Sequence, residues 1–182
     1  MQRKQFLLSA LLAGPAVSLA NMVSEANSHL QPFIVDAQKS RFGDTVKFLG
    51  LHPNDLKISG KDTNGQLSVF EYTGLAKVGP ALHVHFKQDE IFMVMQGEYR
   101  FVVGTETHVL KAGQTIFLPR NIPHTWIQLS DTGKMIYMLQ PAGKMEEFFV
   151  LMNSLKEMPT PAQIDKIHAA HQMKVVGPPL SL

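Results

Sequence analysis

The chain has 182 residues, of which 45% are hydrophobic, so it is long and apolar enough for one domain with a sizeable core. Its formal net charge is +2, from 17 lysines and arginines and 15 aspartates and glutamates. No basic stripe predicts a nucleic-acid partner, and no acidic tail predicts a basic one. The absence of cysteine excludes disulfides, thiolate metal ligands and a cysteine nucleophile.

The first twenty residues have the pattern of an export signal. Arg3 and Lys4 form a short positive region. The stretch 6–20 is apolar and small, and its last three residues, Ser-Leu-Ala, suit a signal peptidase. We therefore expect a signal peptide over 1–20 and an exported, periplasmic protein, by the Sec or the twin-arginine route. An N-terminal helix or anchor is the alternative. After processing, we expect no stable membrane anchor.

From residue 45 onward, the pattern is that of a β protein, after a linker and first extended segment over 21–44. The clearest turn is 61–65, because its Asn-Gly pair readily takes positive φ. Short strands at this spacing are typical of a sandwich or barrel. The predicted strands are 46–49, 67–72, 81–86, 90–95, 99–103, 107–110, 115–118, 124–129 and 134–139.

Near the end of the chain, the hydrophobic residues recur at the spacing of an α-helix. The segment 144–155 has one apolar face of methionines and phenylalanines. Thr160 and Pro161 then have the pattern of an N-cap and the first residue of a second helix. We expect a mostly β domain over 45–143 and a helical extension over 144–182, with its helices packed outside the β domain.

Four residues form a candidate metal site. His83 and His85 are two apart in the predicted strand 81–86, so both side chains point to the same face. Glu90 follows five residues later, and His124 lies beyond a turn with glycine and proline. Three neutral imidazoles and one carboxylate suit zinc, manganese, iron, nickel, cobalt or copper, and are too nitrogen-rich for calcium or magnesium. The sequence does not decide among these divalent transition metals.

The spacing around these ligands forms two blocks. Six residues separate Glu90 from Gly97, and five separate Gly113 from Pro119, with His124 four residues further on. The two blocks resemble the two conserved motifs of the cupin superfamily, and every metal-ligand position of those motifs is filled. The resemblance implies a cupin double-stranded β-helix, which is a jelly-roll barrel with the metal ligands inside.

The sequence departs from the motifs at turn positions. Lys77 stands where the first motif has a glycine, although Gly79 is nearby. Asn121 replaces the glycine after Pro119, and Gln128 replaces the closing asparagine. Asparagine tolerates positive φ better than other non-glycine residues, so we expect it to hold a similar turn.

Further segments are similar to single-domain bacterial cupins related to quercetin 2,3-dioxygenase, namely 63–65, 68–71, 141–143, 146–149 and 177–180. This resemblance implies a metal-dependent dioxygenase of flavonol-like or other enolic aromatic substrates, with dioxygen as co-substrate. Glu90 would then be both a metal ligand and the catalytic base. Two alternatives remain open: a cupin isomerase or epimerase of small polar substrates, and a non-enzymatic module that binds metal and a small ligand.

Strand parity suggests which side chains surround the site. Phe92 shares the parity of Glu90, and Trp126 shares the parity of His124, so both should point into the barrel. They are candidates to line a substrate pocket, and barrel core is the alternative for each. Met93 and Met95 have the opposite parity and should face the other sheet or a dimer partner. Small cupins commonly pair through their outer sheets, so the resemblance implies a homodimer.

Two further histidines lie in the predicted second helix. His168 and His171 are three residues apart and can share a helix face. A solvated helix face is the expectation, with a second metal site as the alternative.

Overall fold

The computed structural model describes residues 31–43 and 45–182, and the fold lies within the unit Ile34–Leu182. The signal peptide predicted over 1–20 lies outside the described residues. Among the described residues, no helix is long and apolar enough to span a membrane.

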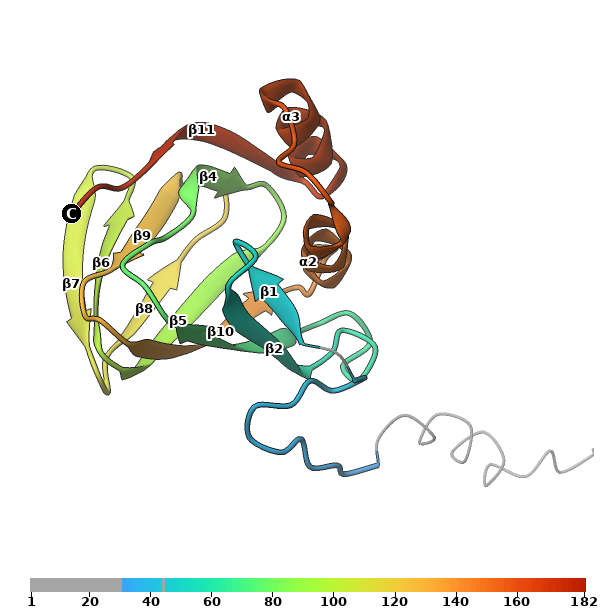
Figure 1. Cartoon of the computed structure of the whole chain (residues 1–182). Helices are drawn as coiled ribbons and strands as arrows, with labels where there is room; N and C mark the ends of the chain where they lie inside the picture. Colours follow the sequence, from blue (N-terminus) through green and yellow to red (C-terminus); the bar gives the residue numbers. More distant parts are fainter. Residues whose placement is uncertain (1–30, 44) are drawn as a thin grey trace, which may run out of the picture. The chain divides into compact units, whose positions relative to one another are not determined.

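Two antiparallel sheets face each other and form the jelly-roll barrel (Figure 1). One sheet has six strands in the order β1-β2-β3-β10-β5-β8, and the other has five in the order β11-β4-β9-β6-β7. The fold is therefore mostly β, as predicted. The strands are β1 (Val46–Phe48), β2 (His52–Ile58), β3 (Ser68–Gly74), β4 (Ala81–His85), β5 (Asp89–Gln96), β6 (Glu98–Val103), β7 (Glu106–Lys111), β8 (Thr115–Leu118), β9 (His124–Gln128), β10 (Gly133–Gln140) and β11 (Met173–Pro179).

The sequence analysis identified nine of these eleven strands and did not predict β2. This strand contains Pro53, Asn54 and Asp55, which have low β propensity. Side-chain hydrogen bonds from other parts of the fold offset this low β propensity. The Asn54 side-chain oxygen accepts from the hydroxyl of Tyr137 at 2.9 Å, and the Asp55 carboxylate accepts from the hydroxyl of Thr45 at 2.5 Å. Tertiary partners that are distant in sequence therefore stabilise β2.

The last strand, β11, lies within 144–182, the segment that was predicted to be a helical extension. β11 pairs with β4, with Met173 opposite His85 and Val175 opposite His83. It is an edge strand, which is where prolines such as Pro178 are tolerated in a sheet. The segment after residue 143 therefore contributes a strand to the barrel as well as the expected helices.

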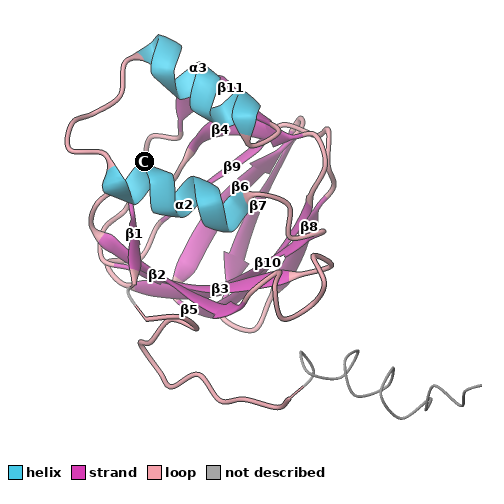
Figure 2. Cartoon of the chain, turned by 90° about the vertical axis from the view of Figure 1, so that its right-hand side faces the viewer, coloured by secondary structure: helices cyan, strands magenta, loops and turns pink. Residues whose placement is uncertain are grey.

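Two helices lie on one side of the barrel (Figures 1 and 2). α2 (Met145–Ser154) lies against β1, and α3 (Pro161–Ala170) lies against β11. The predicted N-cap of α3 is confirmed. The hydroxyl of Thr160 accepts a hydrogen bond from the backbone N–H of Gln163, whose side chain accepts from the backbone N–H of Thr160. This capping box satisfies two N–H groups that would otherwise lack partners at the helix start.

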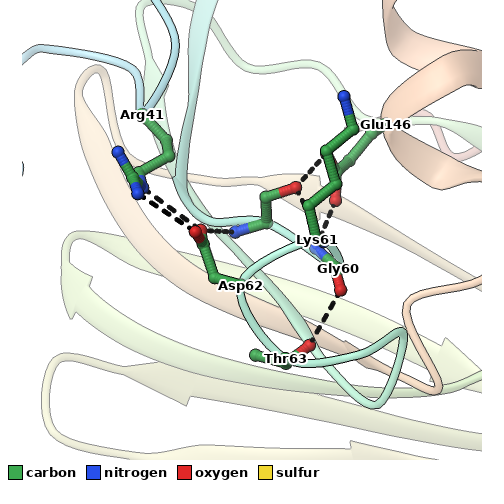
Figure 3. Close-up of polar contacts among 7 residues, drawn as sticks. Arg41, Gly60, Lys61, Asp62, Thr63 and Glu146 are labelled. Atoms are coloured by element: carbon green, nitrogen blue, oxygen red, sulfur yellow. Dashed lines mark hydrogen bonds and ion pairs between the residues drawn. The ribbon is translucent and has the colours of Figure 1, made fainter. Parts of the chain in front are cut away.

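A carboxylate fastens the start of α2 to the β2–β3 loop (Figure 3). Glu146 accepts hydrogen bonds from the hydroxyl of Ser59 at 2.8 Å and from the backbone N–H of Gly60 at 2.6 Å. In the same loop, Asp62 accepts from the backbone N–H of Ser59 at 3.0 Å and pairs with Arg41 at 3.1 Å. An anionic side chain in the first turn also interacts favourably with the helix dipole. The loop and the helix are therefore held as one piece.

Alternation along β5 shows how the interior is built. Glu90, Phe92 and Val94 are buried and point inward, whereas Met93 and Met95 are exposed on the outer face. Burying a ring such as Phe92 stabilises the fold by about 1.5–3 kcal/mol. Glu90 therefore lies at one end of the interior, and the aromatic core follows along the same strand.

Candidate metal centre

The fold brings the four predicted ligands together. His83 and His85 come from β4, Glu90 from the start of β5, and His124 from the start of β9. His83 and His124 are directly opposite each other in the β4–β9 pair. One ligand atom from each of the four residues lies within 4.8 Å of the others. Among the described residues, this is the single group of three or more candidate ligands.

The cluster is buried but not sealed. His85, Glu90 and His124 are buried, and His83 is partly exposed. Two surface cavities, of about 330 and 700 Å³, are lined by residues within 103–122 and within 155–167 and by none of the four ligands. The partly exposed His83 marks the side from which solvent reaches the cluster.

Backbone carbonyls orient two of the imidazoles. The Nδ1 atom of His83 is 2.8 Å from the carbonyl oxygen of Ala81, and the Nδ1 atom of His124 is 2.9 Å from that of Ile122. Each Nδ1–H donates to its carbonyl in the tautomer that these acceptors favour. This tautomer leaves the lone pair of Nε2 free, which is the arrangement that metal-binding histidines adopt.

The electrostatics favour the ligand protonation states. Burial, followed by the neighbouring His124 and His85, lowers the pKa of His83 to about 3. Burial also lowers the pKa of His85. For Glu90, burial opposes ionisation, but the surrounding imidazoles outweigh it and lower its pKa to about 2. His83 and His85 are therefore neutral and Glu90 is anionic at neutral pH.

Polar atoms without ordinary partners show that a cation fits this site. Both ring nitrogens of His85 are buried and lack a hydrogen-bond partner. The Nε2 atom of His124 is 3.0 Å from one carboxylate oxygen of Glu90, and the Nε2 atom of His85 is 3.7 Å from the other. A divalent transition metal would bind these Nε2 atoms and the carboxylate together, which gives the Nε2 atom of His85 a partner. The donor set does not distinguish among the six metals considered.

The sequence analysis missed an ion pair beside the ligands. Arg120 donates to the Asp89 carboxylate from its backbone N–H at 2.8 Å, from Nε at 3.0 Å and from a terminal nitrogen at 2.6 Å. These hydrogen bonds lower the pKa of Asp89. Asp89 immediately precedes Glu90, and Arg120 lies in the turn that leads to His124. The pair therefore ties β5 to the turn that leads into β9.

The turn with the unusual asparagine is held as predicted. Asn121 has a φ of 66°, and its backbone N–H donates to the carbonyl oxygen of His85 at 2.8 Å. Gly97 and Gly113, the motif glycines, have φ values of 85° and 88°. Asparagine therefore occupies the left-handed position where the motif has glycine.

The two predicted pocket residues point into the barrel and join its core. Phe92 stacks on Tyr137 with centroids 5.2 Å apart, and Trp126 stacks on Phe48 at 5.7 Å. Trp126 also meets Tyr72 edge-on at 5.1 Å. Their placement agrees with the parity argument, and contact with substrate stays a prediction.

The interior also contains buried polar atoms without hydrogen-bond partners, which include the side-chain amide nitrogen of Asn54 and the hydroxyls of Ser68 and Tyr72.

Comparisons with known proteins agree with this fold and site. The family model described as "Cupin domain" matches residues 73–139, which include all four candidate ligands. KdgF from Halomonas sp. matches with a TM-score of 0.51 and 17% identity, over 61% of this chain and 94% of that chain. An RmlC-like cupin from Shewanella frigidimarina NCIMB 400 matches with a TM-score of 0.52 and 17% identity, over 64% of this chain and 96% of that chain. A comparison with curated proteins found no match. The match to the family model lies within the β domain of this chain, and the two solved structures share its fold.

Proposed function

We propose that the protein is a metal-dependent dioxygenase of flavonol-like or other enolic, oxygen-rich aromatic compounds. The observation that carries the proposal is the partly open cluster of three histidines and one carboxylate beside an aromatic interior. His83, His85, Glu90 and His124 would hold the metal. The aromatic walls favour a planar, apolar substrate with a few polar groups. The reaction class itself rests on the resemblance of the sequence.

Glu90 is the residue that could move a proton. A divalent metal in this site would supply Lewis acidity, which makes a substrate hydroxyl easier to deprotonate. Glu90 is the carboxylate of the cluster and is anionic, so one of its oxygens can accept that proton. Its low pKa makes it a weak base, so the transfer requires an acidified hydroxyl. The three histidines would keep the metal in place while Glu90 accepts the proton.

Replacing Glu90 tests this proposal. The metal-loaded protein is incubated aerobically with quercetin, and oxygen uptake and loss of flavonol absorbance are recorded. Glu90→Gln keeps the shape but loses the base, so turnover should fall by about 100- to 10,000-fold, more than the metal content falls. The matched control is Glu98→Gln, because Glu98 lies on β6 in a loose 4.0 Å pair with Lys111. A Glu90→Gln protein that binds metal and keeps full turnover would show that Glu90 is not the base.

A second candidate function is an isomerase or epimerase of small polar substrates. The unpartnered polar atoms of Asn54, Ser68 and Tyr72 favour it, because a buried polar group needs a hydrogen-bond partner. A third is a module that binds metal and a small ligand without turnover. A wild-type protein that takes up no oxygen with quercetin but interconverts a polar substrate supports the second. A protein that is inert and tightly liganded supports the third.

We also propose a homodimer that pairs through the outer face of the six-stranded sheet. Met93 and Met95 of β5 and Phe117 of β8 are exposed on this face. Exposed apolar side chains that gather on one face are typical of an interaction surface. Sedimentation should give a dimer at micromolar concentration, and a monomer at that concentration contradicts the proposal. Export to the periplasm stays a prediction, which the mass and location of the mature protein would test.

A further inference from the structure

Gln88 is a buried side chain whose polar atoms have no partner. It lies in the turn between β4 and β5, three residues after His85 and two before Glu90. Only 1% of its surface is exposed, and both amide atoms lack a hydrogen bond. Burying an unpaired amide costs free energy, since its hydrogen bonds to water are lost and not replaced. A hydrophobic side chain of similar size would fill the same space without this cost.

The chain makes room for this amide. Gly143, between β10 and α2, has a φ of +57°, and a Cβ built on it would lie 1.6 Å from the amide nitrogen of Gln88. Any other residue at position 143 would therefore collide with the amide as well as adopt a strained backbone. The backbone at Gly143 therefore borders the space that the Gln88 amide occupies.

His85 is the ligand that lacks an orienting partner. The Nδ1 atoms of His83 and His124 contact the carbonyl oxygens of Ala81 and Ile122. The Nδ1 atom of His85 has no such acceptor and is fully buried. A metal-binding imidazole almost always donates its second N–H to an acceptor, which sets the tautomer and the ring orientation.

Gln88 is placed to provide that acceptor. The Gln88 amide and the Nδ1 atom of His85 belong to residues three apart in the chain, and both are buried without a hydrogen-bond partner. The two groups do not form a hydrogen bond of ordinary geometry. However, the terminal torsion of glutamine is soft, so the amide can turn its oxygen toward Nδ1.

We propose that Gln88 is a positioning residue for the metal centre: its side-chain oxygen accepts the Nδ1 proton of His85, so that Nε2 faces the metal. Gly143 keeps the space that the amide needs. This inference rests on the proposed metal binding and not on the proposed reaction, because it concerns how tightly the site holds a cation.

Zinc titration of the full chain tests the inference without any substrate. The affinity for Zn²⁺ is measured in competition with a chromophoric chelator, and metal-free stability is measured by urea unfolding. Gln88→Met removes the acceptor at similar volume and should weaken Zn²⁺ binding about 10- to 100-fold. Its metal-free stability should be unchanged or higher, because two unpaired polar atoms are removed. Gln88→Glu keeps an acceptor oxygen for the Nδ1 proton and should therefore bind Zn²⁺ more tightly than Gln88→Met does.

The matched control is Gln96→Met. Gln96 lies at the other end of β5, is exposed and makes only a long 3.4 Å contact with Thr132, so Zn²⁺ affinity should not change.

Several results would overturn the inference. A Gln88→Met protein that binds Zn²⁺ like wild type but is less stable, or that does not fold, shows that the amide has a structural role only. Equal losses in Gln88→Met and Gln88→Glu show that the acceptor oxygen is not the cause. If wild type itself binds no Zn²⁺, the proposed metal site fails together with this inference. If only the variants contradict it, the metal site stands and Gln88 alone is wrongly assigned.

Discussion

Two groups of histidines in this molecule look similar in sequence and differ in structure. His83 and His85 lie two apart on a strand, and His168 and His171 lie three apart at the end of α3. In the first group, β9 adds His124 and β5 adds a carboxylate, so four ligand atoms converge. In the second group, no third candidate ligand joins the pair among the described residues.

The helical pair is held by its own helix. The Nδ1 atoms of His168 and His171 contact the carbonyl oxygens of Ile164 and Ile167 at 2.8 and 2.7 Å. Both rings meet Phe148 of α2 edge-on, with centroids 5.1 and 5.5 Å apart. These contacts make the pair a packing element between α2 and α3, where a solvated helix face was expected. Close histidines form a candidate metal site only when residues from other strands complete the set.

Removing one histidine from each group should give the largest contrast. His124→Ala deletes a ligand, so Zn²⁺ affinity should fall more than about 100-fold, beyond the range expected for groups that only orient a ligand. His168→Ala should leave the affinity within about threefold. Competition with a chromophoric chelator measures both. Equal losses in the two variants would contradict the distinction and place α3 in the metal site.

A smaller effect should come from the ion pair that joins the ligand-bearing strands. Arg120 contacts Asp89 through three hydrogen bonds, one step along the chain from Glu90. Arg120→Met removes the side-chain hydrogen bonds to Asp89. The turn before His124 is then held less firmly against β5. The same titration should show Zn²⁺ affinity lowered by about tenfold, at the lower end of the range for orienting groups.

The control for this effect is Lys111→Met. Lys111 is exposed, and its Nζ lies 4.0 Å from a carboxylate oxygen of Glu98. An exposed ion pair this long does not fix the position of either strand. Its loss should leave Zn²⁺ affinity unchanged. If the two variants behave alike, the Asp89–Arg120 pair does not support the site.

Local pattern was enough to predict most of the barrel and the ligand set. Alternation placed His83, His85, Glu90 and Phe92 on inward faces, because side chains alternate along every strand. Motif spacing then linked His124 to the others, although it is distant in sequence. The two blocks carry this information because ligands and turns recur at fixed offsets.

The parts that the sequence did not reveal depend on contacts between distant segments. β2 is stabilised by Tyr137, which no local pattern connects to Asn54. The partner of Asp89 is Arg120, 31 residues later. Gln88 lay between two recognised ligands, but its burial is visible only once Gly143 is placed against it. Propensity and spacing do not encode such partners.

The smallest expected effect concerns pH and the helical pair. Burial, with a further contribution from the neighbouring His171, lowers the pKa of His168 below its ordinary value of 6.5. The folded protein therefore takes up this proton less readily than the unfolded chain does. The contribution of His168 to stability is fully present above pH 6.5 and is lost as the pH falls from that value toward the lower pKa of the folded state.

His168→Gln should remove this part of the pH dependence. Urea unfolding of the metal-free proteins between about pH 8 and pH 5.5 should show wild type losing more stability than the variant. The difference should stay below about 1 kcal/mol, because His168 is partly exposed and solvent screens its charge. Burial lowers the pKa of His52 as well, so both proteins should keep a residual acid sensitivity. Identical pH profiles would mean that His168 is no harder to protonate in the folded state than in the unfolded chain. His168 would then lie on a solvated helix face, as the sequence alone suggested. The two groups of histidines would differ less in their burial than the ring contacts with Phe148 indicate.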